Sequence, residues 1–369
     1  MALVFVWTLL MGLEGDASEL PLVPAPEEGA KAAPVNQQQS LISGFLVLDT
    51  GSLNARPSGA RSGSTLRLIG TDGQQLCVLT DLNQNETIGG THCISIDHQR
   101  GRIYFLENAD QRLTALDKMG KVLWRLKSVG VSSVAVDARS GNIWCEVGAS
   151  LFEKKTIVVG LDGKILTEYP WGGVDIVYDP QSDVFWIAGR QILRVSREGK
   201  VFLLRPLPEL PGLPDVPTVI NARNWAAVSI TPDIVHTVGS ARYGGAWVAV
   251  RSHPDVKGSR NRLIRLDDNG ETRALVELAE VDPFAVACDA NGNCWVADRA
   301  KQLLQFDLDG EQVLRLPIPA LAIVADEVRG EMCVSTEEGL LRINGDGRVT
   351  GQTKFSYPSK QTWLGVTRP

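Results

Sequence analysis

The stretch DHQRGRIYFLENADQRLTALDKMGKVLWRL, residues 97–126, decides the fold. It contains three short apolar runs, at 102–106, 112–116 and 122–126, and each run is bounded by polar or glycine-containing breaks. Short apolar runs separated by turn signals are typical of an antiparallel β-meander. The same pattern recurs along the chain after residue 40, so we interpret this stretch as one unit of a repeat.

A glycine-centred turn before an apolar run marks each copy of the repeat. Seven such turns occur, at mean intervals of about 46 residues. Glycine suits these hairpin turns because they require a positive φ. The marker residues are Gly73, Gly120, Gly163, Gly199, Gly270, Gly310 and Gly347.

A second marker is an apolar run that ends in Asp or Thr before a turn. We interpret these short polar side chains as hydrogen-bond partners of the turn backbone rather than as a ring of metal ligands. The markers are Asp97, Asp137, Asp179, Thr231, Asp289, Asp326 and Thr367. The run that follows carries an aromatic residue in five copies, which we expect to pack between neighbouring sheets: Tyr104, Trp144, Trp186, Trp247 and Trp295.

Four strands in every 40–50 residues predict an all-β protein, a seven-bladed β-propeller. Residues 43–81 supply three strands with no first strand before them, and residues 363–367 supply a first strand with nothing after it. We therefore expect the C-terminal strand to join the N-terminal blade and close the ring. Closure removes the exposed sheet edges that promote aggregation.

The N-terminus differs from the repeat in composition. Residues 1–18 contain an apolar run followed by small residues, which predicts a secretory signal or hydrophobic leader, and residues 19–40 are rich in Pro, Ala, Glu and Gln, which predicts a flexible linker. The propeller then covers residues 41–369. We expect an exported protein, periplasmic or extracellular, with no spanning segment in the mature domain.

Charge and cysteine usage exclude several classes of protein. A formal net charge of −6 argues against nucleic-acid binding, which needs a basic surface. The six cysteines form no C-x-x-C pair, so we expect buried thiols rather than a zinc ribbon. Cys288 and Cys294 flank the turn DANGN and can face each other across a hairpin, which leaves a disulfide between them as an alternative.

Residues 131–164, with VAVD, GNIW and LDGK, resemble NHL-type propeller repeats, and residues 285–310 repeat the pattern. The resemblance covers about 41–369. It implies the propeller fold but not one activity, because such propellers include binding modules, lyases and lactonases. The gluconolactonase and senescence-marker family is distantly similar and holds a divalent cation at its channel. Its Glu-Gly-Pro and Pro-Asn-Gly signals are missing from this chain.

Counting back from the first-strand markers predicts which residues lie at the mouth of the central channel. We expect His92, Asp175 and Asp282 to converge there, where they would hold a divalent cation or exchange protons; a water-filled polar channel is the alternative. Two long loops should carry basic residues on the same face, one of them at 251–262. The predicted ligand-binding residues are His92, Asp175, Trp225, Asp282, Trp363, Arg251, His253 and Arg299.

These observations favour an exported propeller, expected to be a monomer, that binds a small ligand or a protein partner at its channel mouth. The alternatives are a metal-dependent hydrolase or lyase of the lactonase-like type, with a divalent cation as cofactor, and a structural interaction platform. No nucleophile elbow, HExxH pair or phosphate loop assigns a catalytic residue.

Overall fold

The computed structural model describes the repeat region as strands and turns. Within the described residues no helix is long and apolar enough to span a membrane, and residues Gln39–Pro369 form one compact unit. The described residues are 44–49, 65–70, 75–79, 94–107, 112–118, 120–127, 131–148, 154–173, 175–179, 182–189, 191–206, 233–239, 244–251, 261–326, 329–354 and 362–367.

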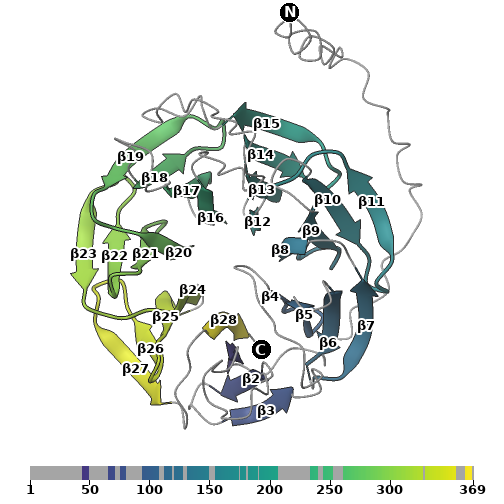
Figure 1. Cartoon of the computed structure of the whole chain (residues 1–369), viewed down its shortest axis with the longest axis horizontal. Coiled ribbons are helices and arrows are strands. Elements are labelled where there is room, and N and C mark those ends of the chain that lie inside the picture. Colours follow the sequence, from purple (N-terminus) through teal and green to yellow (C-terminus); the bar gives the residue numbers. More distant parts are fainter. Residues whose placement is uncertain are drawn as a thin grey trace, which may run out of the picture. The chain divides into compact units, whose positions relative to one another are not determined.

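Six four-stranded antiparallel sheets are each built from strands that follow one another in the chain (Figure 1). The first three consist of β4 (Ile94–Asp97), β5 (Arg102–Glu107), β6 (Arg112–Asp117) and β7 (Val122–Lys127); β8 (Val131–Val136), β9 (Ile143–Val147), β10 (Lys155–Val159) and β11 (Ile165–Tyr169); and β12 (Asp175–Asp179), β13 (Val184–Ala188), β14 (Gln191–Ser196) and β15 (Val201–Pro206). The next three consist of β16 (Asp233–Gly239), β17 (Ala246–Arg251), β18 (Asn261–Leu266) and β19 (Thr272–Leu278); β20 (Pro283–Cys288), β21 (Cys294–Asp298), β22 (Gln302–Phe306) and β23 (Gln312–Leu316); and β24 (Ala322–Asp326), β25 (Glu331–Ser335), β26 (Gly339–Ile343) and β27 (Val349–Lys354).

The two ends of the repeat region form a further sheet. Strand β28 (Thr362–Thr367) pairs antiparallel with β1 (Gly44–Asp49), which is followed in the sheet by β2 (Thr65–Gly70) and β3 (Gln75–Leu79). First strands of neighbouring sheets contact one another in the order β4, β8, β12, β16, β20, β24, β28 and back to β4. The prediction that the C-terminal strand joins the N-terminal strands is therefore confirmed.

The prediction of seven equivalent blades is corrected by the packing. Side-chain packing is described in six blades, β4 to β27, and these six are the propeller blades that the structure supports in full. The sheet β28-β1-β2-β3 is described by backbone pairing alone. The physical reason lies in the markers: the first copy supplies three strands and the last copy one, so the number of markers overstates the number of blades made from one continuous segment.

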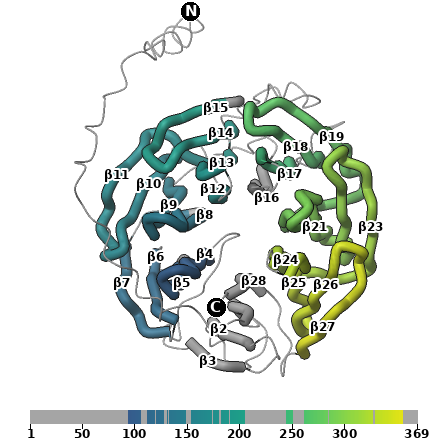
Figure 2. Tube along the Cα trace, turned by 180° about the vertical axis from the view of Figure 1, so that it is seen from behind, coloured from purple at the N-terminus to yellow at the C-terminus, as the bar shows by residue number. Residues whose placement is uncertain are grey.

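The aromatic residue of each second strand lies in the core, as the sequence predicts. Figure 2 shows the second strands β5, β9, β13 and β21 inside the ring of outer strands. Indole and phenol rings at this place fill the space between adjacent sheets, with Trp144 stacking on Phe185 of the next blade at a centroid distance of 4.3 Å. The five side chains are at most 1% exposed: Tyr104, Trp144, Trp186, Trp247 and Trp295.

The turn chemistry is also confirmed wherever the markers are described. Six marker glycines have φ between 77° and 85°, and the marker aspartates accept hydrogen bonds from turn amides. Asp289 is the fullest case, because its Oδ1 accepts from the amides of Asn291 and Asn293, and its Oδ2 accepts from the Trp295 indole. Gly73 lies outside the described residues.

One first strand is not where the marker places it. The sequence predicts that the first strand of the fifth unit ends at Thr231, followed by an extended turn. The structure instead has β16 at Asp233–Gly239, paired with β17. Pro232 follows Thr231, and because a proline lacks the N–H that an inner strand donates, the segment after it is the better strand.

Candidate functional site at the mouth face

The chain's first strands begin at one face of the ring, which we call the mouth face; the loops from second to third strand and the links between blades lie there too. One row of residues lies near this face in every blade, and its second- and third-strand members are paired in register. We call it the mouth row. Its pairs are Leu106–Leu113, Glu146–Thr156, Ala188–Ile192, Ala249–Leu263, Ala297–Leu303 and Ser335–Leu340.

Apolar or small residues fill most of the mouth row, since the row packs between blades. One blade departs from this rule with a charged residue, Glu146 of the β8–β11 blade. Arg262 of the β16–β19 blade lies one position closer to the mouth face than the row, where the other third strands carry Arg112, Lys155, Gln191, Gln302 and Gly339. Glu146 and Arg262 are both buried, with 0% and 6% of their surface exposed. A buried charge is costly unless it is paired or neutralised, so Glu146 is the strongest departure from the repeat in this row.

Glu146 joins its own blade to the link that enters the next one. Its Oε1 accepts a hydrogen bond of 2.8 Å from the Thr156 hydroxyl on the neighbouring strand. Its Oε2 accepts a hydrogen bond from the backbone N–H of Gly173, which lies just before β12. The Glu146 side chain therefore fixes the place where the chain crosses from β11 to β12.

A second carboxyl group lies at the start of β12. The Ser133 hydroxyl of β8 donates to Asp175 Oδ1 at 2.8 Å, and the backbone N–H of Ile176 lies 3.0 Å from the same oxygen. Asp175 is 3% exposed and Ser133 is fully buried. Hydroxyl and carboxyl groups of two blades thus form one buried cluster, which we call the acidic cluster: Ser133, Glu146, Thr156, Gly173 and Asp175.

Burial governs the electrostatics of the acidic cluster. It raises the pKa of Glu146 to about 8; the hydrogen bonds from Gly173 and Thr156 oppose the shift, and the Asp175 carboxylate adds to it. Burial also lowers the pKa of Lys154, while the Glu146 carboxylate acts in the opposite direction. Glu146 is therefore largely protonated near neutral pH and can exchange a proton there.

The structure distributes the predicted site residues unevenly. Asp175 lies in the acidic cluster, and Asp282 and Arg299 lie close together, with Arg299 Nε 3.7 Å from Asp282 Oδ2. Arg251 ends β17 and Trp363 lies in β28, and only their backbone pairing is described. His92, Trp225 and His253 lie outside the described residues. Trp225 was predicted by counting back from Thr231 as the end of a first strand. This basis is wrong, because the first strand of that blade is β16, which begins at Asp233.

The predicted metal site is not assembled from described residues. Asp175 begins β12 and Asp282 precedes β20, so the β16–β19 blade separates them in the ring. Among the residues that the structure describes, no group of three or more His, Cys, Asp and Glu side chains is placed to hold a metal ion. The four cysteines whose side chains the structure describes are free buried thiols, and Cys288 stands opposite Cys294 without a disulfide.

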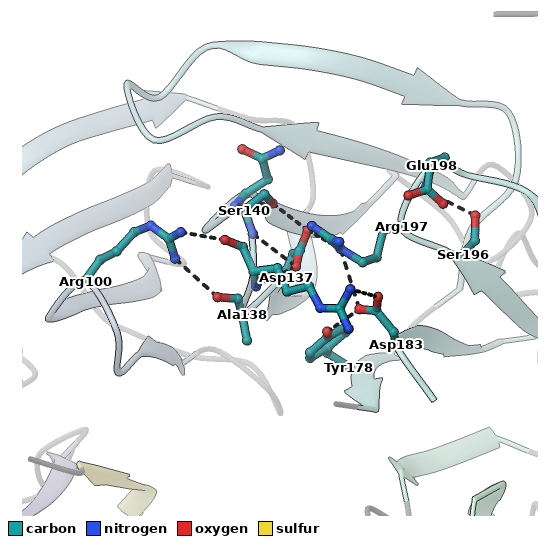
Figure 3. A network of polar contacts seen from close by, with 11 residues as sticks. Arg100, Asp137, Ala138, Ser140, Tyr178, Asp183, Ser196, Arg197 and Glu198 are labelled. Atoms are coloured by element: carbon teal, nitrogen blue, oxygen red, sulfur yellow. Dashed lines mark hydrogen bonds and ion pairs between the residues drawn. The ribbon is translucent and has the colours of Figure 1, made fainter. Parts of the chain in front are cut away.

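The opposite face carries a different polar network, which links three blades (Figure 3). Arg100 donates to the carbonyls of Ala138 and Arg139. Arg197 pairs with Asp137 at 2.8 Å and approaches Asp183 at 3.6 Å. Tyr178 donates to Asp183 at 2.6 Å. The contacts of Arg100 and the Arg197–Asp137 pair join neighbouring blades, and the contacts of Asp183 with Arg197 and Tyr178 lie within the β12–β15 blade, so the network has a structural role.

Sequence reasoning missed Glu146 as a distinctive residue. It was detectable, because Glu146 interrupts the apolar second strand IWCEV where the corresponding residues are Leu106, Ala188, Ala249, Ala297 and Ser335. Alignment of the strands across blades supplies this signal. A count from the end of the first strand does not, since it examines only the channel-lining strands.

Comparison with known proteins supports the fold. No family model matches the chain, and no curated protein matches it. Among solved structures, apo AztD from Citrobacter koseri aligns over 89% of this chain and 99% of its own, with 13% identity and a TM-score of 0.55. Kuenenia stuttgartiensis hydrazine synthase aligns over 90% and 99%, with 10% identity and a TM-score of 0.56. BamB from Moraxella catarrhalis aligns over 86% of both chains, with 13% identity and a TM-score of 0.49. At these identities the likeness establishes the fold alone: the chain is a β-propeller.

Proposed function

We propose that the chain is an exported β-propeller module that binds a ligand or protein partner at its mouth face. One observation carries the proposal. In the β8–β11 blade the mouth row buries Glu146 and Thr156 in place of the alanine, isoleucine and leucine that most other described blades bury there, and Ser133 and Asp175 are buried beside them. Polar substitutions that lower packing energy on one face only are expected where that face has a task besides holding the blades together.

The longest insertion in the repeat supports the same proposal. The interval between Gly199 and Gly270 is the longest between markers, and it falls between the β12–β15 and β16–β19 blades. Long insertions on a regular scaffold commonly carry the binding function. The NHL-type resemblance adds support for the scaffold only. Export is proposed from the composition of residues 1–40.

Direct binding measurements test the proposal. The purified chain is titrated by calorimetry with defined probes: free amino acids, short peptides, di- and tricarboxylates, oligosaccharides, Ca²⁺ and Zn²⁺. We expect at least one probe to bind, and Ser133→Ala with Asp175→Asn to weaken that binding. Lys164→Gln is the matched control, because Lys164 lies at an exposed turn of the opposite face. Binding that Lys164→Gln abolishes, or no binding by any probe, would contradict the proposal.

A further inference from the structure

Two cysteines face each other across the hairpin between β20 and β21. Cys288 ends β20, Cys294 begins β21, and the two are direct partners in the register of the sheet. At the turn, the Asp289 N–H donates to the Asn293 carbonyl at 3.0 Å, and the Gly292 N–H donates to the Asp289 carbonyl at 3.0 Å. The backbone groups of successive strand residues point to opposite sides, so Cys288 and Cys294 form a non-hydrogen-bonded pair.

This geometry suits a disulfide. Residues of such a pair have Cα atoms about 4.5 Å apart and close side chains, and disulfides join cysteines whose Cα atoms are about 4.4–6.8 Å apart. Both thiols lie on the same face of the sheet, because they pack in one cluster of buried residues together with Val286 and Val296. The two strands are therefore already placed as a cross-link requires.

The cysteine pair is not part of the repeat. The same place in the other five blades from β4 to β27 holds no cysteine; its pairs are Ile96–Ile103, Val136–Ile143, Tyr178–Phe185, Gly239–Ala246 and Ala325–Met332. The other two cysteines whose side chains are described have no cysteine opposite them. Cys145 faces Val134 and Ile157, and Cys333 faces Val324 and Arg342.

The finished fold shields both thiols from reagents. Cys288 is 7% exposed and Cys294 is fully buried. Burial raises the pKa of the Cys294 thiol well above its ordinary value, and the neighbouring Cys288 and Asp289 add to the shift. Buried thiols of this kind are inert, because the thiolate is the reactive form. The hairpin itself is closed by local contacts and such hairpins form quickly, so the two thiols can meet before the blade is packed.

We propose that Cys288 and Cys294 form a disulfide while the chain folds in the presence of a disulfide oxidant, and that the completed blade then shields the bond. One thiolate attacks a sulfur of the oxidant and releases one thiol; the second attacks the protein sulfur of the mixed disulfide and releases the other. Two electrons pass from the cysteines to the oxidant, and the two protons end on the released thiols. The proposed export would bring the chain into a compartment where such oxidants act.

The experiment uses the full chain made by cell-free synthesis in a glutathione buffer, mainly oxidised in one arm and reduced in the other. Free thiols are alkylated in denaturant, and the peptides are mapped by mass spectrometry. The double variant Cys288→Val, Cys294→Ile copies the pair of the β8–β11 blade. Cys145→Val is the matched control, because it removes a buried thiol that faces no cysteine.

We expect the oxidised arm to yield a Cys288–Cys294 peptide that is not alkylated and is lighter by two hydrogens, in the parent and in Cys145→Val alike. The oxidised parent should melt a few degrees above the reduced parent, because the cross-link restricts the unfolded chain. The double variant should lose this difference. Oxidised glutathione added after the reduced chain has folded should leave both thiols open to alkylation once the protein is unfolded.

Three results would overturn the inference. Complete alkylation of both cysteines in the oxidised arm would mean that they are only small core side chains. A disulfide from either one to a different cysteine would assign the wrong partner. Oxidation of the folded, reduced chain as readily as during synthesis would contradict the shielding.

Discussion

The β8–β11 and β16–β19 blades both bury a charged residue near the mouth face, but its surroundings differ. Glu146 has a hydrogen-bond donor for each carboxyl oxygen, one from Thr156 and one from Gly173. Arg262 has two buried nitrogens without an acceptor. Near one face of the ring the fold therefore buries a satisfied acid in one blade and an arginine with two unsatisfied nitrogens in another.

The two residues are therefore expected to have opposite effects on the stability of the fold. A buried polar group that its own fold satisfies contributes to stability, and its removal leaves partners unpaired. A buried group that the fold leaves unsatisfied lowers stability until something else pairs with it. Glu146 belongs to the first kind and Arg262 to the second, so substitutions at the two positions should change stability in opposite directions.

The largest effect is expected for Glu146→Ala. The change leaves the Gly173 N–H and the Thr156 hydroxyl without their acceptor and opens a cavity between two blades. We expect the free energy of unfolding to fall by about 2–4 kcal/mol, measured by urea denaturation at pH 7. A loss no larger than that of Lys164→Gln would show that Glu146 does not connect the blades.

The pH dependence of Glu146→Gln sharpens the comparison. Burial raises the pKa of Glu146 from 4.5 to about 8. Below pH 4.5 the carboxyl is protonated in both folded and unfolded chains. Between pH 4.5 and 8 only the unfolded chain releases the proton, so stability falls as pH rises, by an amount on the order of a few kcal/mol. Above pH 8 this decline ends.

Glutamine resembles the protonated acid, so Glu146→Gln should remove this part of the pH dependence. The variant should match the parent near pH 4.5 and exceed it at pH 8.5, as measured by denaturation midpoints across the range. Parallel curves for the two proteins would mean that the carboxyl titrates at an ordinary pKa.

A somewhat smaller effect is expected for Gly173→Ala, which tests the link that Glu146 holds. A Cβ at Gly173 would meet the Ala188 carbonyl oxygen at 2.5 Å, and backbone cannot move aside as a flexible side chain can. We expect a loss of about 1–3 kcal/mol in unfolding free energy. Gly345→Ala is the control, because nothing lies within 4 Å of its added Cβ. Equal melting temperatures for the two variants would contradict the tight packing of this link.

The smallest effect is expected for Arg299→Ala. The arginine lies 3.7 Å from Asp282, and both side chains are more than one-third exposed. Such surface pairs contribute about 0–1 kcal/mol. We expect no measurable change in melting temperature, in contrast to Glu146→Ala. A large fall in melting temperature would mean that this exposed pair stabilises the fold, contrary to the prediction.

Sequence periodicity predicted much of the fold and little of the site. The marker glycines, the turn aspartates and the buried aromatic row follow from local chemistry that each copy repeats. One chain therefore shows the same pattern several times, which makes it detectable. Asp175 was predicted because it begins a first strand. Glu146 was missed because it is distinctive only by comparison with the residues at the same place in the other blades, and the pairing of the sheets fixes that register. The burial of Arg262 follows from tertiary packing, which local sequence does not show.

The error at Thr231 has a related cause. An apolar run ending in Thr satisfied the marker, but a neighbouring run, Asp233–Gly239, pairs with β17 instead. Where two candidate strands lie close together in sequence, local pattern does not choose between them, and tertiary pairing decides. Metal binding by His92, Asp175 and Asp282 stays a prediction, since His92 lies outside the described residues.

The pairing of β28 with β1 also sets an order of events during synthesis. The two strands are separated by more than 300 positions in the chain, so this contact cannot form until the ribosome has released residues near Thr367. Blades such as β8–β11 need only local segments and can form earlier. Pairing between distant segments is slow because loop-closure entropy opposes it. The sheet that joins the two ends is therefore expected to form last, and until then the strands beside it present open edges to chaperones or to other chains.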